Sequence, residues 1–231
     1  MNKLTLFILL LAGFAVQAQT AQNAKPADLP DRPNHVFDDD GGAVQIVPRN
    51  SAAPTTEKTF HGGAVMKSVC QVSIFLGSGW GDQQARARET ALLDLSTGSN
   101  GSLSSELQKH GIKSAPSAPS QEDFSDLAKS PAPLNDLAIQ RRLADMIEKK
   151  AVAAPTAETV FVVFLAPGLH SSLGAHQGGR DFAAYHNFFH AAAGEVRYVV
   201  VPFDSNPETH RQAAAQAFVN TALNPTGNGW F

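Results

Sequence analysis

The chain has 231 residues, of which 43% are hydrophobic and 17% are charged, so it is long and apolar enough for one domain with a substantial core. Its formal net charge of -3, with no cluster of lysine and arginine in the sequence, argues against nucleic acid as a partner. A single cysteine, Cys70, excludes an internal disulfide, so we expect packing alone to stabilise the fold and Cys70 to be a small buried packing residue.

The first residues have the three-part layout of a secretory signal. Lys3 gives a positive start, an apolar run extends from Leu4 to Val16, and small residues at Val16 and Ala18 suit a signal peptidase. The run is too short to span a bilayer, which takes about 20 residues. The pattern predicts a cleaved signal peptide over 1–18, a mature chain that begins at Gln19, a secreted or periplasmic location, and no stable membrane insertion after cleavage.

The segment 19–58 is rich in proline, carries the acidic run Asp38-Asp39-Asp40 and has few large apolar residues. Such a composition buries too little surface to offset the entropy that ordering costs. We therefore expect a disordered tail over 19–58, with at most a short strand at 45–47. The folded domain is expected over 59–231.

Apolar runs and turn residues predict the elements of this domain in the order strand, helices, strand, helix, strand, helix. The continuous apolar run at 159–165 is typical of a central strand that is covered on both faces. The order indicates the α/β class, as a layered domain with a small mixed or parallel sheet flanked by helices. Expected strands cover 69–76, 159–165 and 196–201; expected helices cover 82–95, a segment capped by Asn135, 181–193 and 207–223; and 98–120 is expected to be a loop with a short helix.

Short motifs lie near the ends of these elements. They are His61-Gly62-Gly63-Ala64-Val65-Met66 with the strand ending in Gly77-Ser78-Gly79-Trp80, the strand 159–165 closing on Ala166-Pro167-Gly168, the segment Gly168-Leu169-His170-Ser171-Ser172, and the ending Asn224-Pro225-Thr226-Gly227-Asn228-Gly229-Trp230-Phe231. In this order and spacing they resemble the phosphate-induced protein family, also named EXORDIUM-like. The resemblance covers about Phe60 to the C-terminus and implies an extracytoplasmic protein. The cysteine-rich parts of plant members are missing here, so their role in growth is not carried over.

Some relatives in that family carry His-Glu-x-x-Glu just before Asn-Pro, which would make the last helix zincin-like. Aligned on Asn224-Pro225, the same positions here hold Gln216, Ala217 and Asn220. An amide is a poor zinc ligand, alanine cannot take a proton from water, and asparagine offers only a neutral oxygen. The resemblance thus implies a degenerate metallopeptidase motif without catalytic residues. The polar stripe of Gln212, Gln216 and Asn220 suits ligand binding across a cleft, but its place on an alanine-rich helix favours a solvated or helix-pairing face.

Histidines provide an alternative, a metal-dependent hydrolase. His186 and His190 are four residues apart in the expected helix 181–193, so they would share a face and could bind zinc with His170 or His176 as a third ligand. No glutamate lies between them to act as a base. The four nearby aromatic residues favour ordinary packed histidines, and no cofactor is expected unless zinc binds here.

Polar residues that follow two expected strands outline a binding site. His170, Ser171 and Ser172 follow the second strand and Asp204 follows the third, where ligands bind in α/β sheets. The Gly-x-Ser-x-Gly nucleophile elbow is absent from the sequence, and Asp204 also suits a turn. The sequence therefore predicts a secreted, non-catalytic protein that binds an envelope or extracellular ligand. The alternatives are the metal-dependent hydrolase and a structural or interaction module of the cell envelope.

Overall fold

The structure is a computed structural model that describes residues 34–40, 42–49, 58–81, 102–115, 117–123 and 133–230. The chain divides into two units, Met1–Asp31 and Arg32–Phe231, and all of the described residues belong to the second. The expected signal peptide and the expected helix at 82–95 lie outside the described residues.

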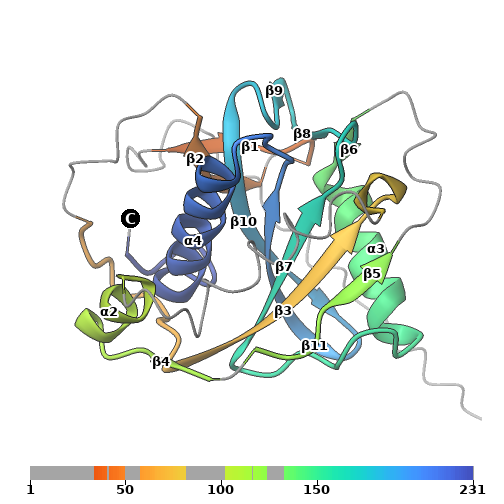
Figure 1. Cartoon of the computed structure of the whole chain (residues 1–231). Coiled ribbons are helices and arrows are strands. Elements are labelled where there is room, and N and C mark those ends of the chain that lie inside the picture. Colours follow the sequence, from red (N-terminus) through yellow and green to blue (C-terminus); the bar gives the residue numbers. More distant parts are fainter. Residues whose placement is uncertain are drawn as a thin grey trace, which may run out of the picture. The chain divides into compact units, whose positions relative to one another are not determined.

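A mixed eight-stranded sheet forms the framework of the second unit (Figure 1). The strand order is β1-β2-β10-β11-β7-β3-β4, and β5 also pairs with β3. β2, β11, β7, β3, β4 and β5 run in one direction, whereas β1 and β10 run in the other. The strands are β1 (His35–Phe37), β2 (Ala43–Pro48), β3 (Ser68–Leu76), β4 (Lys113–Ser114), β5 (Gln121–Asp123), β7 (Thr159–Leu165), β10 (Phe182–Ala191) and β11 (Gly194–Val201).

The central position of β7 follows from its sequence. All seven of its residues are buried, and it pairs in parallel with β3 on one side and β11 on the other. Val160, Val162 and Phe164 enter one hydrophobic core, and the intervening residues enter the core on the opposite face. An apolar run without alternation is what a strand covered on both faces requires. The three expected strands, and the central place of β7, are confirmed.

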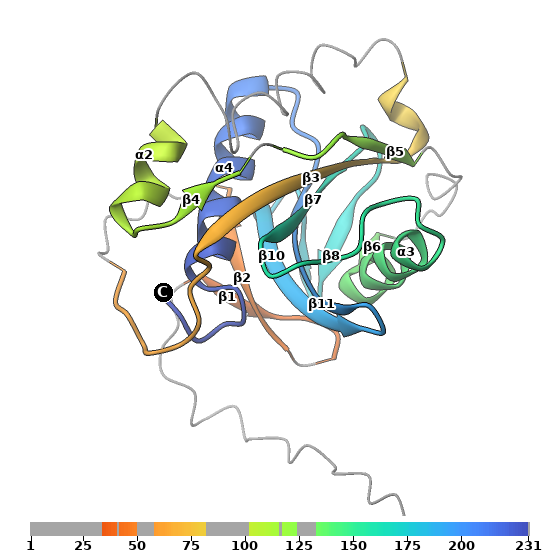
Figure 2. The same ribbon diagram turned by 90° about the horizontal axis from the view of Figure 1, so that it is seen from below.

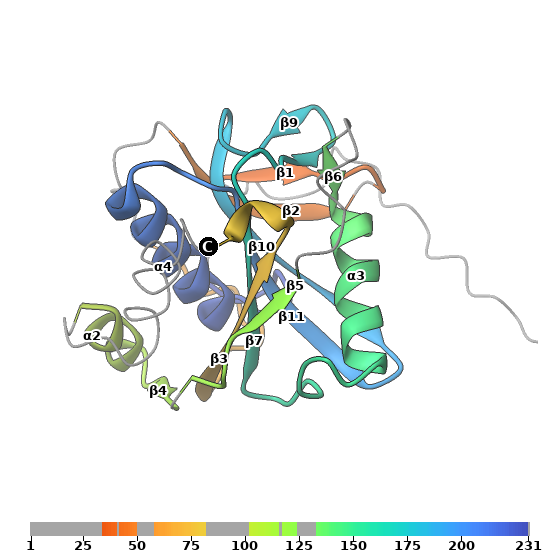
Figure 3. The same ribbon diagram turned by 45° about the vertical axis from the view of Figure 1, so that its right-hand side comes forward.

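Helices cover both faces of the sheet (Figures 2 and 3). α4 (Pro207–Leu223) and α2 (Ser102–Lys109) contribute to one core, and α3 (Asp136–Glu148) contributes to the other. Asn135 caps α3 as expected, because its side chain accepts a hydrogen bond from the amide of Ala138 at 2.9 Å. The α/β class and the layered arrangement are therefore established. None of the described helices is both long and apolar enough to cross a membrane.

A smaller three-stranded sheet lies beside α3 and consists of β6 (Leu134–Asn135), β8 (Ser171–Leu173) and β9 (His176–Gln177). A short 3-10 helix, η2 (Ser78–Trp80), follows β3. Cys70 on β3 is only half buried, which corrects its expected burial.

The helix expected at 181–193 is wrong, because this segment forms strand β10. It makes a hairpin with β11 in which Ala191 pairs with Gly194, and it also pairs with β2 on its other side. Alanines favour a helix, but the aromatic residues Tyr185, Phe188 and Phe189 favour a strand. Pairing along both edges outweighs the local preference for a helix in this segment.

The expectation of a disordered tail is also wrong for residues 34–40 and 42–49. β1 and β2 belong to the main sheet, and Val44, Ile46 and Val47 are buried in the two cores. The expected short strand at 45–47 lies within β2 and is confirmed. The apolar residues of β2 gain their burial from β10, far away in the sequence, which a local composition cannot reveal.

The first and last motif segments pack backbone against backbone. Phe60 forms a bridge with Trp230, and the amide of His61 donates to the carbonyl of Gly229 at 3.0 Å. A side chain on Gly63 would overlap the carbonyl group of Asn228, so only glycine fits at this crossing. Gly63 therefore has a packing role in this chain.

Candidate functional site

The loops after three parallel strands meet at one edge of the main sheet. Arg49 follows β2, His170 follows β7 and Asp204 follows β11. Together with Arg180, these residues line a cavity of about 420 Å³, here named the strand-edge pocket. Glycines 168, 178 and 179 and the apolar residues Leu169, Pro202 and Phe203 complete much of its wall. Ligands commonly bind at this edge of an α/β sheet.

An ion pair crosses the pocket wall. Nη2 of Arg49 lies 2.9 Å from Oδ2 of Asp204, whose side chain is only 10% exposed. Oδ1 of Asp204 accepts a hydrogen bond from the amide of Asn206 at 2.8 Å. Asp204 therefore acts as a turn residue and also holds the guanidinium of Arg49 at the pocket.

Two further basic side chains lie at the rim. Arg180 is 62% exposed and pairs with Asp181 at 2.6 Å, and the imidazole of His170 is exposed. The hydrogen bond from Arg180, together with one from the amide of Gln177, lowers the pKa of Asp181 to about 2. Asp181 therefore stays ionised and fixes Arg180 beside the pocket at neutral pH.

The two expected serines do not line the pocket. Ser171 is fully buried in β8, where its carbonyl accepts a hydrogen bond from the amide of Gly178 at 2.8 Å. Within the described part of the chain, its hydroxyl has no hydrogen-bond partner. Ser172 pairs with Gln177 in the small sheet. Both serines thus support the loop that carries Gly178, while His170 and Asp204 are the expected residues that the structure brings together.

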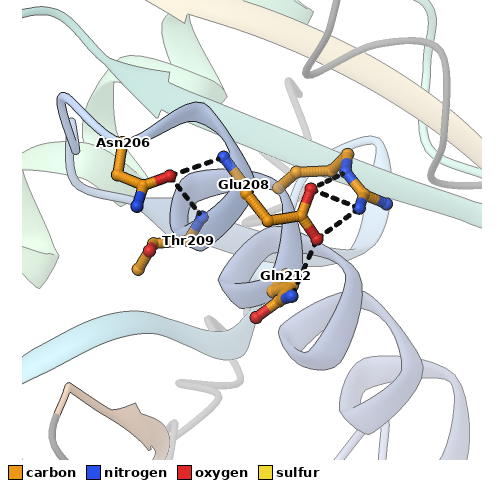
Figure 4. A network of polar contacts seen from close by, with 5 residues as sticks. Asn206, Glu208, Thr209 and Gln212 are labelled. Atoms are coloured by element: carbon orange, nitrogen blue, oxygen red, sulfur yellow. Dashed lines mark hydrogen bonds and ion pairs between the residues drawn. The ribbon is translucent and has the colours of Figure 1, made fainter.

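The polar stripe expected on the last helix is divided among three environments. Gln212 is exposed and donates to Glu208 at 2.7 Å, in a surface network that continues to the cap residue Asn206 (Figure 4). Gln216 is half buried. Asn220 is buried and accepts a hydrogen bond from Nζ of Lys58 at 2.5 Å.

The expected cleft between this stripe and His170 is absent among the described residues. α4 starts near the strand-edge pocket, and Asn220 lies about 20 Å further along the helix because each residue adds about 1.5 Å. Ala217 is fully buried in the core, so a general base at this position would face apolar side chains rather than a water molecule.

The histidines expected to bind zinc are spread over the molecule. His186 is buried on the α4 side of β10, whereas His190 is exposed near the end of the same strand. Four residues of a strand span about 13 Å, so the pair does not share one helical turn and that part of the hypothesis is wrong. His170 lies at the strand-edge pocket and His176 is exposed on β9. Among the described residues no group of three or more His, Cys, Asp or Glu side chains is arranged to hold a metal ion.

A buried carboxylate that the sequence did not reveal lies between α3 and the sheet. The hydroxyl groups of Tyr185 and Tyr198 donate to Asp136 at 2.7 and 2.6 Å, and Asn187 and Gln140 donate to its second oxygen. Burial, together with the nearby carboxylate, raises the pKa of both tyrosines well above the usual value. The cluster is closed by its own hydrogen bonds, so it fixes α3 to the sheet.

His210 is buried in an aromatic cluster behind the pocket wall. Its ring lies 6.0 Å from the ring of Phe203 and 6.4 Å from that of Trp80. Burial lowers the pKa of His210 to about 4, although the carboxylate of Asp204 opposes this effect. The imidazole is therefore neutral at physiological pH and acts as an aromatic packing residue beneath Phe203.

Sequence reasoning missed the two arginines of the pocket. Arg49 lies in the segment expected to be disordered, and Arg180 lies in a loop without any motif. A weak signal was present, since Arg49 lies two residues after the strand-like run 45–47.

Comparison of the chain with protein-family models, curated proteins and solved structures found no match.

Proposed function

We propose that this chain is an exported, non-catalytic binding protein that holds a small organic anion in the strand-edge pocket. The observation that carries the proposal is the Arg49–Asp204 ion pair, which holds a guanidinium at the cavity, with Arg180 and His170 at its rim.

The chemistry of arginine supports an anionic ligand. A guanidinium has five N–H donors in a planar fork, and the ion pair with Asp204 is made by Nη2 of Arg49. The remaining donors match the paired oxygens of a carboxylate or a phosphate group. At Gly179 an added Cβ would meet only Nη1 of Arg49, at 3.9 Å, so this glycine leaves room for a ligand beside the guanidinium, and Phe203 offers an apolar wall.

The lining favours binding over catalysis. Among the described lining residues, no serine, threonine or cysteine is hydrogen-bonded to a base, and the nearby hydroxyl of Ser171 is buried beneath the pocket. Asp204 is already engaged with Arg49 and with the turn, so it is poorly placed to take a proton from a substrate.

The location and the family are part of the same proposal. The signal-like residues 1–18 support export, and the four motif segments support a divergent EXORDIUM-like relative. The contact between Gly63 and Asn228 gives a physical reason why two of these segments would occur together. We propose that α4 descends from a zincin helix but has no zincin chemistry, because Ala217 is packed in the hydrophobic core.

Isothermal titration calorimetry of the purified domain tests the ligand class. Inorganic phosphate, citrate and glucose 6-phosphate are the anionic probes, and glucose is the neutral control. We expect at least one anion to bind and glucose not to bind at this pocket. Because each bond to a charged group contributes about 1.5–3 kcal/mol, Arg180→Gln should weaken anion binding by about tenfold or more.

Arg141→Gln provides the matched control, because Arg141 is an exposed arginine on α3 outside the pocket. This variant should bind the anion as the unmodified chain does. Equal loss of binding in both variants would indicate a general charge effect, and binding that Arg49→Lys and Arg180→Gln leave unchanged would rule out the strand-edge pocket.

A further inference from the structure

A row of polar side chains crosses three neighbouring strands and lines a cavity that shares no lining residue with the strand-edge pocket. His35 on β1 and His186 on β10 both pair directly with Gln45 on β2. Residues directly opposite in neighbouring strands have their side chains on the same face of the sheet. This face is covered by the C-terminal part of α4, where Asn220 and Asn224 are buried.

The hydrogen bonds of this row fix the tautomer of His186. Oε1 of Gln45 accepts from Nδ2 of Asn224 at 3.3 Å and lies 2.8 Å from Nε2 of His186. Because this amide oxygen only accepts, the proton of the neutral imidazole is on Nε2. Burial lowers the pKa of His186 to about 3, so the ring is neutral over the physiological range.

Nδ1 of His186 is consequently an acceptor with a lone pair. The side chain is only 5% exposed, and within the described residues Nδ1 has no hydrogen-bond partner. Leaving a buried acceptor unpaired costs free energy, and native structures nearly always satisfy such groups. His186 also lines a cavity of about 180 Å³ together with His35, Phe188 and Thr226, so space for a partner exists beside it.

We propose that this cavity, the His186 pocket, is a second binding site, and that it takes a small neutral molecule with several hydroxyl groups, one of which donates to Nδ1. The charges around the cavity oppose each other. The C-terminal end of α4 carries a partial negative charge, and the ammonium of Lys58, held by Asn220 beside this end of the helix, carries a positive one, so a neutral ligand needs no counter-charge here.

Histidine-ring nitrogen NMR on the whole mature protein tests this inference directly. Xylitol is the probe, and fully O-methylated xylitol is the matched control, because it keeps the oxygens but has no donors. The Nδ1 resonance of His186, assigned by its loss in His186→Gln, should shift saturably with xylitol and not with the methylated compound. His186→Gln should weaken xylitol binding by about three- to tenfold, the range for one neutral hydrogen bond.

His190→Gln serves as the control variant, because His190 is an exposed histidine on the same strand and does not line this cavity. It should leave the xylitol response unchanged. Absence of any xylitol-dependent shift at His186, or an equal shift with the methylated compound, would overturn the proposal. A shift produced by zinc but not by xylitol would overturn it as well, in favour of a metal ligand.

Discussion

Replacement of Gly229 by alanine tests whether the contact between the two glycine motifs is structural. An added Cβ would lie 2.8 Å from the carbonyl oxygen of Ala64 and 3.0 Å from Cα of Asn224, and closer still to the carbonyl oxygen of Leu223. All three neighbours are backbone atoms, so none can rotate away. The backbone of Gly229 must therefore move, although its amide donates to Oδ1 of Asn224 at 2.7 Å.

The expected cost is the sum of three effects. Overpacking of a close contact costs about 1–3 kcal/mol, and each weakened hydrogen bond adds about 1 kcal/mol. The lower entropy of the unfolded chain with alanine offsets only about 0.4–1 kcal/mol. We expect Gly229→Ala to lower the free energy of unfolding by roughly 3 kcal/mol, which for a domain of this size corresponds to a fall in Tm of about 6–12 °C.

Urea denaturation and calorimetry measure this change, with Gly81→Ala as the matched control. A Cβ at Gly81 meets no heavy atom within 4 Å, so this variant should be as stable as the original chain or slightly more stable. If Gly229→Ala and Gly81→Ala unfolded at the same urea concentration, the tight backbone crossing between the motifs would be refuted.

Three further predictions concern other parts of the chain. Tyr198→Phe removes one donor to the buried carboxylate of Asp136 and should lower the free energy of unfolding by about 1.5–3 kcal/mol in urea denaturation; an unchanged midpoint would contradict the cluster. Burial lowers the pKa of His186 to about 3 and that of His210 to about 4, from 6.5 in the unfolded chain. As the pH falls, the unfolded state therefore binds protons before the folded state does. The stability that is present above pH 6.5 should be lost as the pH falls toward 4. Urea titrations at several pH values should show this loss, on the order of 3 kcal/mol for His210, and a flat profile would exclude it. Expression in a bacterial host should yield extracytoplasmic protein whose N-terminal sequence starts at or near Gln19, whereas a cytosolic chain that retains Met1 would contradict export.

Elements with strong local signals could be predicted from the sequence. β7 is an unbroken apolar run, and α4 has both a capping asparagine and a proline in its first turn. Each of these signals acts within a few residues, so it does not depend on the fold of the rest of the chain.

Elements that depend on distant partners could not be predicted in this way. β2 and β10 stabilise each other through a ladder of four residue pairs, and β10 makes a second ladder of seven pairs with β11. The composition of 19–58 indicated disorder, and the alanines of 181–193 indicated a helix. In both segments, pairing between distant strands decides the structure.

Only part of the candidate site could be predicted from the sequence, because the rest depends on pairing between distant strands. His170 and Asp204 follow strands that were recognised, so their meeting at the sheet edge could be expected. Arg49 follows β2, whose place in the sheet was unknown, and His35, Gln45 and His186 become neighbours only through the pairing of β1, β2 and β10.

The pairing of β2 with β10 also sets the order in which this sheet can close. Gln45 and His186 are 141 positions apart, so a chain that emerges N-terminus first must wait for nearly its whole length before β2 finds its partner. Until then, the apolar side chains of β2 lack the strand that covers one of its edges. Sheet closure is therefore a late folding step, and this interval is when the chain is most open to aggregation or to capture by a chaperone.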